Sequence, residues 1–403
     1  MDINKLYTEL ESIYPTLVDI RRDLHKHPEL SFQEVRTPKL IADYLTDLGL
    51  EVRTNVGGRG VVGLLRGKHK GKTVALRADF DALPIQDEKN VSYKSQVPGV
   101  MHACGHDGHT ATLLGVATVL AKFREELAGN VVFIHQFAEE LVPGGAKAMI
   151  EDDCLKGVDV IFGTHLQGAL PFGKVYYREG YAMAASDFFE IKIFGKGGHG
   201  ASPHLTVDPL VTASQIVLNL QQIISRRVDP VKPAVLTVGK LHSGTAMNVI
   251  PETAEMSGTV RSFDPETRDL IEMDIKNIAN AACLQSRATC EISYIRGYDA
   301  VWNHPKETQF IRNIAVEVVG TENVMERNLA MGSEDFTYYL KEVPGTYFFV
   351  GASLSDSAKV YPHHHPRFDF DEKTMLTAAK ILVTSVIKYN EKTSNQINNS
   401  IEV

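Results

Sequence analysis

Cysteine is scarce in this chain. The 403 residues include only four, at positions 104, 154, 283 and 290. So few cysteines in so long a chain exclude a disulfide framework as the basis of the fold. We expect a reducing compartment that keeps the thiol of Cys104 free, and we expect the other three cysteines to be small buried residues.

Long hydrophobic runs and basic clusters are also absent. Nowhere do eighteen apolar residues follow one another, and residues 1–6 contain no basic stretch leading into an apolar one. Fifty acidic side chains outnumber 42 basic ones, which gives a formal net charge of -8, and no group of Lys and Arg forms a stripe that could follow a phosphate backbone. We therefore expect a soluble, cytoplasmic protein that binds neither nucleic acid nor membranes.

What the chain has is an ordinary globular composition, with 43% apolar and 23% charged residues. Its length favours two domains. Helical periodicity alternates with short apolar runs along the first part of the sequence. The expected helices are 15–24, 37–48, 108–123 and 145–151, and the expected strands are 60–65, 73–78, 130–137 and 158–164. This alternation predicts an α/β domain whose mixed, mostly parallel sheet is covered by helices on both faces.

The pattern changes near residue 185. A strand with alternating burial is expected at 187–194, and two later helices begin with the good N-terminal signal Asp-Pro, at Asp208-Pro209 and Asp264-Pro265. With strands at 234–241, 253–261 and 288–294, the order is βαββαβ, which is ferredoxin-like. Helices at 310–319 and 371–389 and a strand at 346–350 then resume the first pattern. We expect an inserted domain at 185–295 within a discontinuous domain of 1–184 and 296–403.

A segment rich in metal-binding side chains, Ala103-Cys104-Gly105-His106-Asp107-Gly108-His109, is the most informative local feature. Two further candidate ligand sites, Glu139-Glu140 and His165, follow expected strands. Thiolate, imidazole and carboxylate together are what zinc selects. A structural zinc site is normally closed by Cys and His from short paired loops, so this mixed and dispersed set favours a catalytic metal.

The pair Glu139-Glu140 predicts two different roles for two adjacent carboxylates. Adjacent buried carboxylates repel unless a cation or a proton relieves them. One can ligate metal while the other accepts a proton from water, as metal-assisted hydrolysis requires. The alternative is a solvated surface pair without function.

Several motifs in order along the chain resemble the M20 metallopeptidases, and more closely their amidohydrolase branch, which hydrolyses N-acyl amino acids, hippurate and auxin conjugates. The resemblance spans nearly the whole sequence. The motifs are Arg22-Asp23-Leu24-His25-Lys26-His27-Pro28-Glu29-Leu30-Ser31-Phe32, Leu76-Arg77-Ala78-Asp79-Phe80-Asp81-Ala82-Leu83-Pro84, the segment 101–109 around Cys104, Gly195-Lys196-Gly197-Gly198-His199-Gly200-Ala201-Ser202-Pro203-His204, Asn248-Val249-Ile250-Pro251 with Arg261, and Gly332-Ser333-Glu334-Asp335-Phe336.

The resemblance implies a site for two divalent metal ions, zinc or manganese, with cobalt or nickel as further possibilities. It implies Glu139 as the base and a ligand set of Cys104, His106, Glu140, His165 and a C-terminal histidine. For the last ligand we choose His364, because it precedes Pro366 by two residues as the family's histidine precedes its proline; His363 and His365 stay open as alternatives.

One segment departs from the wider family. Where other M20 members supply a ligand from His-x-Asp, this chain reads Asp79-Phe80-Asp81. The two aspartates are expected either to orient a histidine ligand or to form a capping turn ahead of Pro84. The remaining histidines, among them His109 and His135, are expected to be structural or to support ligands.

The resemblance also implies residues that act from the inserted domain. His199 would stabilise the developing oxyanion, often in the active site of the partner subunit, and Asn248 and Arg261 would contact substrate. Read without the resemblance, Gly197-Gly198 is a bulge, and His199 and Arg261 are surface residues.

Taken together, the sequence predicts a metal-dependent amidohydrolase that cleaves N-acyl amino acids and forms a homodimer through the inserted lid domain. A dipeptidase or aminoacyl carboxypeptidase of the same family is the alternative. A noncatalytic metal- or peptide-binding protein is a second alternative, although such a protein would not need the unligated Glu139.

Overall fold

The computed structural model describes residues 1–401, with side chains described for residues 1–391. The chain divides into two compact units. The large unit comprises Met1–Gly180, Trp302–Asn328 and the segment from Asp335 onward, and the inserted unit comprises Tyr181–Val301 and Leu329–Glu334. The ends of the segment Tyr181–Val301 lie close to the predicted domain boundaries at residues 185 and 295. The prediction, however, assigns residues 329–334 to the large unit.

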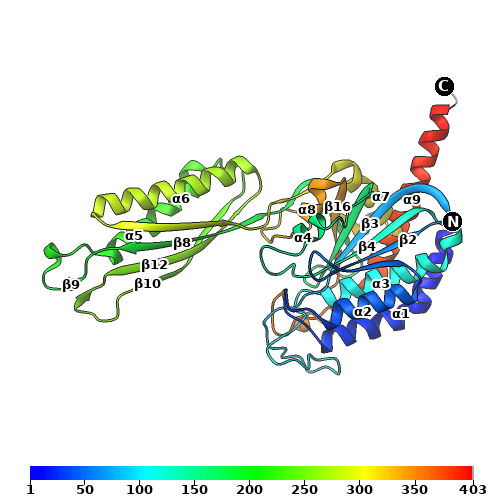
Figure 1. Ribbon diagram of the computed structural model, residues 1–403, viewed down its shortest axis with the longest axis horizontal. Helices are drawn as coiled ribbons and strands as arrows, with labels where there is room; N and C mark the ends of the chain where they lie inside the picture. The colour runs from blue at the N-terminus through cyan, green and yellow to red at the C-terminus, as the bar shows by residue number, and fades with distance from the viewer. Residues whose placement is uncertain (402–403) are drawn as a thin grey trace. The chain divides into compact units, whose positions relative to one another are not determined.

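The large unit is built on a mixed sheet of eight strands (Figure 1). In spatial order they are β1 (Glu51–Val56), β2 (Gly60–Arg66), β4 (Ala128–Gln136), β3 (His69–Asp79), β5 (Val160–Gln167), β16 (Gly345–Gly351), β6 (Val175–Tyr177) and β15 (Val324–Glu326). The four central strands are parallel to one another, whereas β1, β2 and β6 pair antiparallel with their inner neighbours. The expected mixed sheet with a parallel centre is therefore present, and the strands β1, β6 and β15 are additions to the prediction.

Helices cover both faces of this sheet. Gly63 on β2 lies against Leu45 of one helix, whereas Gly60 on the same strand lies against Met149 of another. Residues three apart on a strand point to opposite faces, so these two helices pack on opposite sides. The helices of the large unit are α1 (Ile3–Lys26), α2 (Arg36–Asp47), α3 (His106–Lys122), α4 (Ala146–Glu151), α7 (Pro305–Val319), α8 (Thr337–Glu342) and α9 (Thr374–Ile401).

The helix α1 begins much earlier than the predicted residue 15. Asp2 caps its first turn by accepting a hydrogen bond from the backbone N–H of Asn4 at 3.0 Å. Leu6 and Leu10 are fully buried, so the apolar face continues ahead of Pro15. Proline removes one backbone hydrogen bond, and here the packing of this face outweighs that loss.

The inserted unit has the predicted order of elements. They are β8 (Ala185–Phe194), α5 (Pro209–Gln222), β10 (Val235–Ser243), β12 (Thr253–Ser262), α6 (Pro265–Ser286) and β13 (Thr289–Arg296). The sheet order is β10-β12-β8-β13, with every pair antiparallel. As the sequence indicates, Asp208 and Asp264 cap the two helices by accepting hydrogen bonds from the backbone of the first turn. The strands β7 (Gly180–Met183) and β14 (Val301–Asn303) lie at two of the four points where the chain passes between units.

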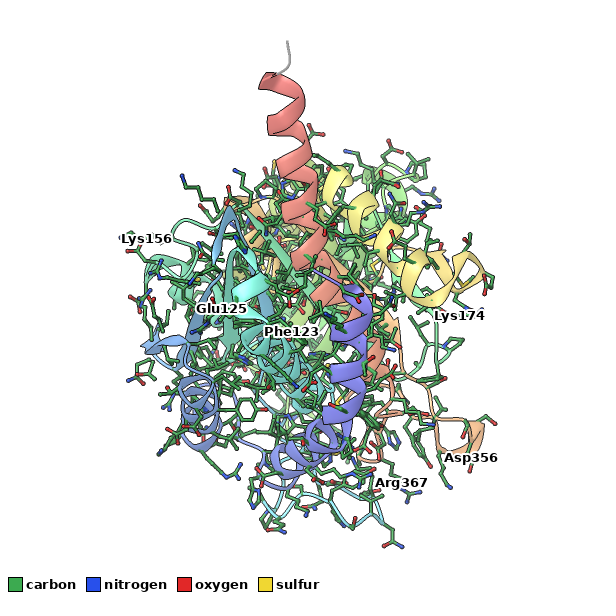
Figure 2. All side chains as sticks on the ribbon, turned by 90° about the vertical axis from the view of Figure 1, so that its right-hand side faces the viewer. Phe123, Glu125, Lys156, Lys174, Asp356 and Arg367 are labelled. Carbon is green, nitrogen blue, oxygen red and sulfur yellow. The ribbon has the colours of Figure 1, made fainter. Side chains whose placement is uncertain are left out.

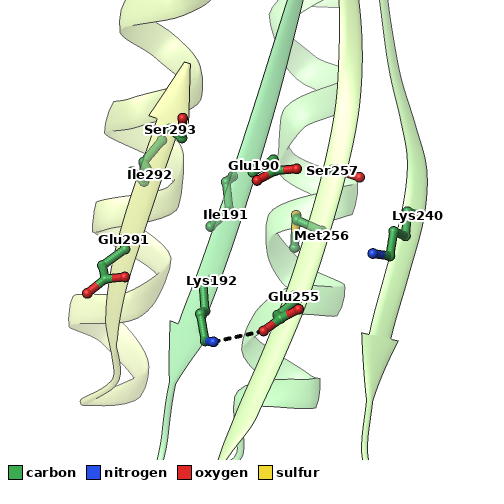
Figure 3. Close-up of a pocket in the computed structure, with 10 residues that line it drawn as sticks. All are labelled: Glu190, Ile191, Lys192, Lys240, Glu255, Met256, Ser257, Glu291, Ile292 and Ser293. Atoms are coloured by element: carbon green, nitrogen blue, oxygen red, sulfur yellow. Dashed lines mark ion pairs between the residues drawn. The ribbon is translucent and has the colours of Figure 1, made fainter. Parts of the chain in front are cut away.

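One face of this sheet packs on the helices and the other carries polar side chains. On β8, Ile191 and Ile193 are buried in the core beneath the helices. Lys192 lies on the opposite face and pairs with Glu255 of β12 at 2.9 Å (Figure 3). The alternation of a half-buried strand is therefore as expected. Cys290 on β13 is only partly buried, which corrects the expectation that it is a core residue.

The exposed surface of the large unit carries ion pairs. Lys156 pairs with Asp153 at 3.7 Å, and Arg367 pairs with Glu88 at 3.5 Å. The two basic side chains, Lys156 and Arg367, are labelled in Figure 2. Such exposed pairs stabilise a fold by at most about 1 kcal/mol each. Within residues 1–401, no helix is long and apolar enough to cross a membrane.

Candidate metal centre and active site

The predicted metal ligands of the large unit gather at the carboxyl ends of the central parallel strands. Glu139 and Glu140 follow β4, and His364 lies in the segment that leads from β16 to α9. His165 lies inside β5, whereas the sequence predicts it just after a strand. His106 begins α3, whereas the sequence predicts it ahead of the helix 108–123. The edge at which parallel strands end is the usual position of an α/β active site.

Five groups of three described residues could each hold a metal ion, and the two that contain Cys104 consist only of predicted ligands. Cys104, His106 and His165 form one group, and Cys104, Glu140 and His364 form the other, with the ligand atoms of each group within 4.8 Å of one another. Together the groups contain all five predicted ligands. The two groups share Cys104.

The separations within these groups are compatible with ligands that share a metal ion. The Sγ atom of Cys104 lies 3.4 Å from Nε2 of His165. Glu140 Oε1 lies 3.3 Å from Nε2 of His364, yet it is buried without a hydrogen bond. Ligand atoms bound to one tetrahedral ion are separated by about 3.5 Å, given metal–ligand bonds of about 2.0–2.3 Å. The two measured separations are therefore close to the value expected for atoms that bind one cation.

The charges of the site also fit a cation. Burial, and then the carboxylates of Glu140 and Glu139, raise the pKa of the Cys104 thiol well above its usual value. Although burial lowers it, the nearby carboxylates of Asp79 and Asp81 raise the pKa of His106 to about 10. A divalent cation would relieve this concentration of negative charge and stabilise the thiolate.

The geometry distinguishes among the three consecutive histidines of the C-terminal segment. His364 is the one grouped with Cys104 and Glu140. Nε2 of His363 accepts a hydrogen bond from the backbone N–H of Gly168 at 3.2 Å, and the ring of His365 stacks on Tyr361 at 4.4 Å between centroids. The structure therefore favours His364, as chosen from the sequence.

Both buried imidazoles of the site are oriented through Nδ1. The Nδ1–H of His165 donates to the carbonyl of Leu166 at 3.0 Å, and that of His106 donates to Asp81 Oδ1 at 3.1 Å. In each ring Nε2 is left to face the site. Asp81 is held in turn by the hydroxyl of Ser31 at 2.7 Å and the backbone N–H of Glu140 at 3.0 Å. Of the two roles considered for Asp81, the structure thus favours orienting a histidine.

Asp79 has a different position from Asp81, within a buried ion network under the site. It accepts hydrogen bonds from Arg77 Nη1 at 2.7 Å and from His109 Nδ1 at 2.6 Å. Arg77 also donates to Gln136 and to Asp335. Asp335 lies just ahead of α8, which begins at Thr337, and its carboxylate belongs to this network.

Sequence reasoning did not assign a role to Arg77. The sequence nevertheless contains evidence for a role of Arg77. An arginine within the apolar strand sequence Val74-Ala75-Leu76-Arg77-Ala78 must be buried, and a buried guanidinium requires carboxylate partners. Among the other histidines, His25 contacts Asp107 and Lys89 in a separate buried network. The rings of His102 and His135 are buried with neither nitrogen hydrogen-bonded among the described residues.

The turn that presents Glu139 and Glu140 is held from behind by a buried acid. Ala138 has a positive φ of 53°, and its backbone N–H donates to Glu34 Oε1 at 3.0 Å. Glu34 is fully buried, and its second oxygen has no hydrogen bond. Burial raises the pKa of Glu34 from its usual 4.5 to about 7. No local sequence pattern indicates this role.

This shift predicts a pH-dependent stability that Glu34→Gln should remove. The folded protein binds the proton more tightly than the unfolded chain, so the stabilisation is complete below pH 4.5 and is lost as the pH rises through 7. Between pH 5 and pH 8 the wild type should lose about 2–3 kcal/mol more than the variant. Urea unfolding at the two pH values measures the difference, with Glu125→Gln at an exposed acid as control. Equal pH dependence in wild type and Glu34→Gln would contradict the assignment.

The predicted active residues of the inserted unit fall into two places. His199 lies in the two-residue strand β9 (Gly198–His199), which pairs with β11 (Val249–Ile250), and the backbone carbonyl of Asn248 accepts the N–H of Gly200 at 2.8 Å. His199 and Asn248 are thus close and both exposed. Arg261 is near the end of β12, whose first residue Thr253 pairs with Phe194. Eight residues of strand, roughly 26 Å, separate Thr253 from Arg261. Within this unit, therefore, Arg261 is not grouped with the other two.

Relatives with assigned names cover nearly the whole chain. YhaA of Bacillus subtilis, named for a proposed amidohydrolase activity, is 52% identical over 390 residues, which is 97% of this chain and 98% of YhaA. Thermostable carboxypeptidase 1 of Saccharolobus solfataricus is 40% identical over 393 residues, covering 97% and 99% of the two chains. N-acetylcysteine deacetylase of Bacillus subtilis is 38% identical over 371 residues, covering 92% and 96%.

Solved structures agree with this relationship. The Bacillus subtilis YXEP protein, described as a dinuclear metal binding peptidase of the M20 family, superimposes with a TM-score of 0.79 at 35% identity and covers 94% of this chain and 99% of its own. An aminohydrolase-like protein from methicillin-resistant Staphylococcus aureus gives 0.90 at 41% identity, covering 96% and 100%. The model of Peptidase family M20/M25/M40 matches residues 75–388. The chain belongs to this family, and it is a hydrolase that acts on amide bonds.

Proposed function

We propose that this enzyme hydrolyses N-acyl amino acids, cleaving the amide between an acyl group such as acetyl or benzoyl and an amino acid to release a carboxylate and a free amino acid. The observation that carries the proposal is the pair of ligand groups that share Cys104, with Glu139 directly beside the ligand Glu140. A relative named as an N-acetylcysteine deacetylase supports the acyl amino acid as substrate.

We propose that five residues would hold two divalent ions, with Cys104 as the ligand that belongs to both groups. The other ligands are His106, His165, Glu140 and His364. Thiolate, imidazole and carboxylate donors favour zinc or manganese, and cobalt or nickel would also bind. When bound, the ions would polarise the scissile carbonyl and make water more acidic.

Glu139 is the base in this proposal. Its carboxylate is buried, adjoins the ligand Glu140, and comes within 4.8 Å of a ligand atom of His106. It would accept the proton of the attacking water and then deliver that proton to the leaving nitrogen. Because Glu34 holds the turn at Ala138, the Glu139 carboxylate would keep its position while Glu140 binds metal.

Three residues of the inserted unit are assigned to the substrate. We propose that His199 donates to the oxyanion that develops on the carbonyl, and that Asn248 and Arg261 contact the substrate, the guanidinium gripping the amino acid carboxylate in a two-pronged fork. His199→Ala should lower kcat without changing metal content, and an unchanged kcat would remove His199 from the mechanism.

A dipeptidase or aminoacyl carboxypeptidase is the second candidate, favoured by the relatives named as thermostable carboxypeptidases. The chemistry at the amide would be the same and only the pocket would differ. A noncatalytic binding protein is the weakest alternative, because binding alone gives no reason for a buried base beside the ligands.

A substrate panel tests the proposal. Purified enzyme loaded with zinc, manganese, cobalt or nickel is assayed on N-acetyl and N-benzoyl amino acids and on dipeptides of the same C-terminal residues. We expect kcat/KM to be at least about tenfold higher for the acyl amino acids. A preference for dipeptides would establish the carboxypeptidase alternative, and no turnover of either class would contradict both.

We further propose a cytoplasmic homodimer formed through the inserted unit, which also acts as a lid. Within the described residues β10 is an edge strand, and α5 exposes the apolar side chains of Leu210, Val211 and Leu218. An exposed apolar patch beside an unpaired strand edge is typical of an interface. Light scattering in solution should give the mass of two chains; the mass of one chain would contradict the dimer.

A further inference from the structure

His109 is a buried histidine that lies among the proposed ligands, and both of its ring nitrogens make hydrogen bonds. It is on the first turn of α3 and is 3% exposed. Its Nδ1–H donates to Asp79 Oδ1 at 2.6 Å, and its Nε2 accepts the backbone N–H of Leu166 at 2.9 Å. Since Leu166 can only donate, the ring carries its proton on Nδ1, and both nitrogens are occupied.

These two hydrogen bonds place His109 between a fixed anchor and the residue after a ligand. The anchor is Asp79, which Arg77 holds through a 2.7 Å ion pair with both side chains buried. At the other end, the Leu166 peptide is held at its N–H by His109, and its carbonyl accepts the Nδ1–H of His165 at 3.0 Å. The orientation of the His165 ring therefore depends on a peptide group that His109 fixes.

The ring of His109 also contacts both imidazole ligands directly. Its centroid lies 4.6 Å from that of His165 with the planes at 74°, and 5.3 Å from that of His106 with the planes at 29°. An edge contact on one ring and a stacked contact on the other restrict both rings at once. One side chain thus links α3, β3 and β5 at the point where the two histidines enter the site.

We propose that His109 is a positioning residue, a strut between Asp79 and the Leu166 N–H that sets the orientation of the His165 and His106 imidazoles for metal binding. This inference rests on the metal centre put forward under the proposed function. It assigns no ligand role to His109. Loss of the strut should weaken binding at the group that contains both histidines while leaving the number of ions bound at saturation unchanged.

Three substitutions at His109 test the contributions of its two hydrogen bonds separately. His109→Phe keeps the ring volume and removes both bonds, and His109→Asn keeps a donor for Asp79 but loses the acceptor for Leu166. His109→Gln places an amide oxygen where Nε2 lies and keeps the acceptor for Leu166. Because the strut acts on His165 through Leu166, the Gln variant should be the least affected.

The matched control is His135→Phe. His135 is also completely buried in the large unit, and neither of its ring nitrogens is hydrogen-bonded among the described residues. This control removes a buried imidazole whose ring nitrogens make no hydrogen bond to a proposed ligand. It therefore measures the general effect of such a substitution on the fold.

The experiment is a titration of the full-length, metal-stripped proteins with Co²⁺, followed by the thiolate-to-cobalt charge-transfer absorption and by calorimetry. We expect His109→Phe and His109→Asn to bind Co²⁺ about 10–100-fold more weakly than wild type, with an altered absorption band. His109→Gln and His135→Phe should stay within a few fold of wild type. Folding of each variant is checked by circular dichroism, and the Asn and Gln pair carries the test if the Phe variant does not fold.

Each result has a defined meaning. Wild-type affinity in His109→Phe or His109→Asn, or an equal loss in His135→Phe, overturns the strut while leaving the metal centre intact. Loss of one bound ion at saturation in all three His109 variants would show that His109 is a ligand and also overturns the proposal. A wild-type protein that binds no Co²⁺ would overturn both the strut and the proposed function.

Discussion

Glu139→Gln should lower kcat by about 10³-fold while leaving two metal ions per chain in place. Glutamine has the shape of glutamate and can still accept hydrogen bonds, but it cannot take a proton from water and return it to the leaving nitrogen. The neighbouring Glu140 supplies the ligand in the proposed centre, so metal binding should not depend on the charge of residue 139. KM should change little, because the lost interaction is made chiefly in the transition state.

The measurement combines steady-state kinetics on an N-acyl amino acid with metal analysis of the same preparation. Glu88→Gln is a suitable control, because Glu88 is an exposed acid of the large unit that pairs only weakly with Arg367 at 3.5 Å. A kcat for Glu139→Gln within about tenfold of wild type would refute the base. A loss of metal in this variant would instead assign Glu139 as a ligand.

Cys104→Ala should remove both metal ions, whereas His364→Ala should remove only one. Cys104 is the one residue common to the two proposed ligand groups, and His364 belongs to only one of them. Without the thiolate each group keeps only two of its three ligands. Activity should fall by about 10³-fold or more in Cys104→Ala, because two-metal hydrolysis depends on both ions.

Metal content by mass spectrometry of the purified variants checks this difference. Cys154→Ala is the matched control, because Cys154 is a buried cysteine of the large unit that belongs to neither group. If Cys104→Ala and His364→Ala each lose a single ion, the thiolate does not bridge. If Cys104→Ala keeps both ions, the proposed ligand set is wrong.

Much of the fold follows from patterns local in the sequence. Asp-Pro starts identify α5 and α6, because capping and a preset φ act within one turn. Alternating burial on β8 identifies a strand with one solvated face. The early start of α1 could not be predicted, since Pro15 argues against a helix and only packing against other elements outweighs it. The strands β6 and β15 were missed because three residues each are too few for a period to show.

Part of the candidate site could likewise be predicted from the sequence, and part could not. The ligand types can be read from the sequence because thiolate, imidazole and carboxylate have chemistry of their own, and their positions after strands indicate one edge of a sheet. Hydrogen-bond partners are not encoded locally. Asp79 and Asp81 are two residues apart yet serve different histidines, and Glu34 acts on a turn about a hundred residues away. Such roles emerge only when distant segments are placed together.

The most direct test of the central claim is a crystal of this protein grown with Zn²⁺ and examined by anomalous diffraction. The account predicts two peaks flanking the Sγ atom of Cys104, one bound by His106 and His165 and the other by Glu140 and His364. A single peak, or peaks outside this set of side chains, would contradict it.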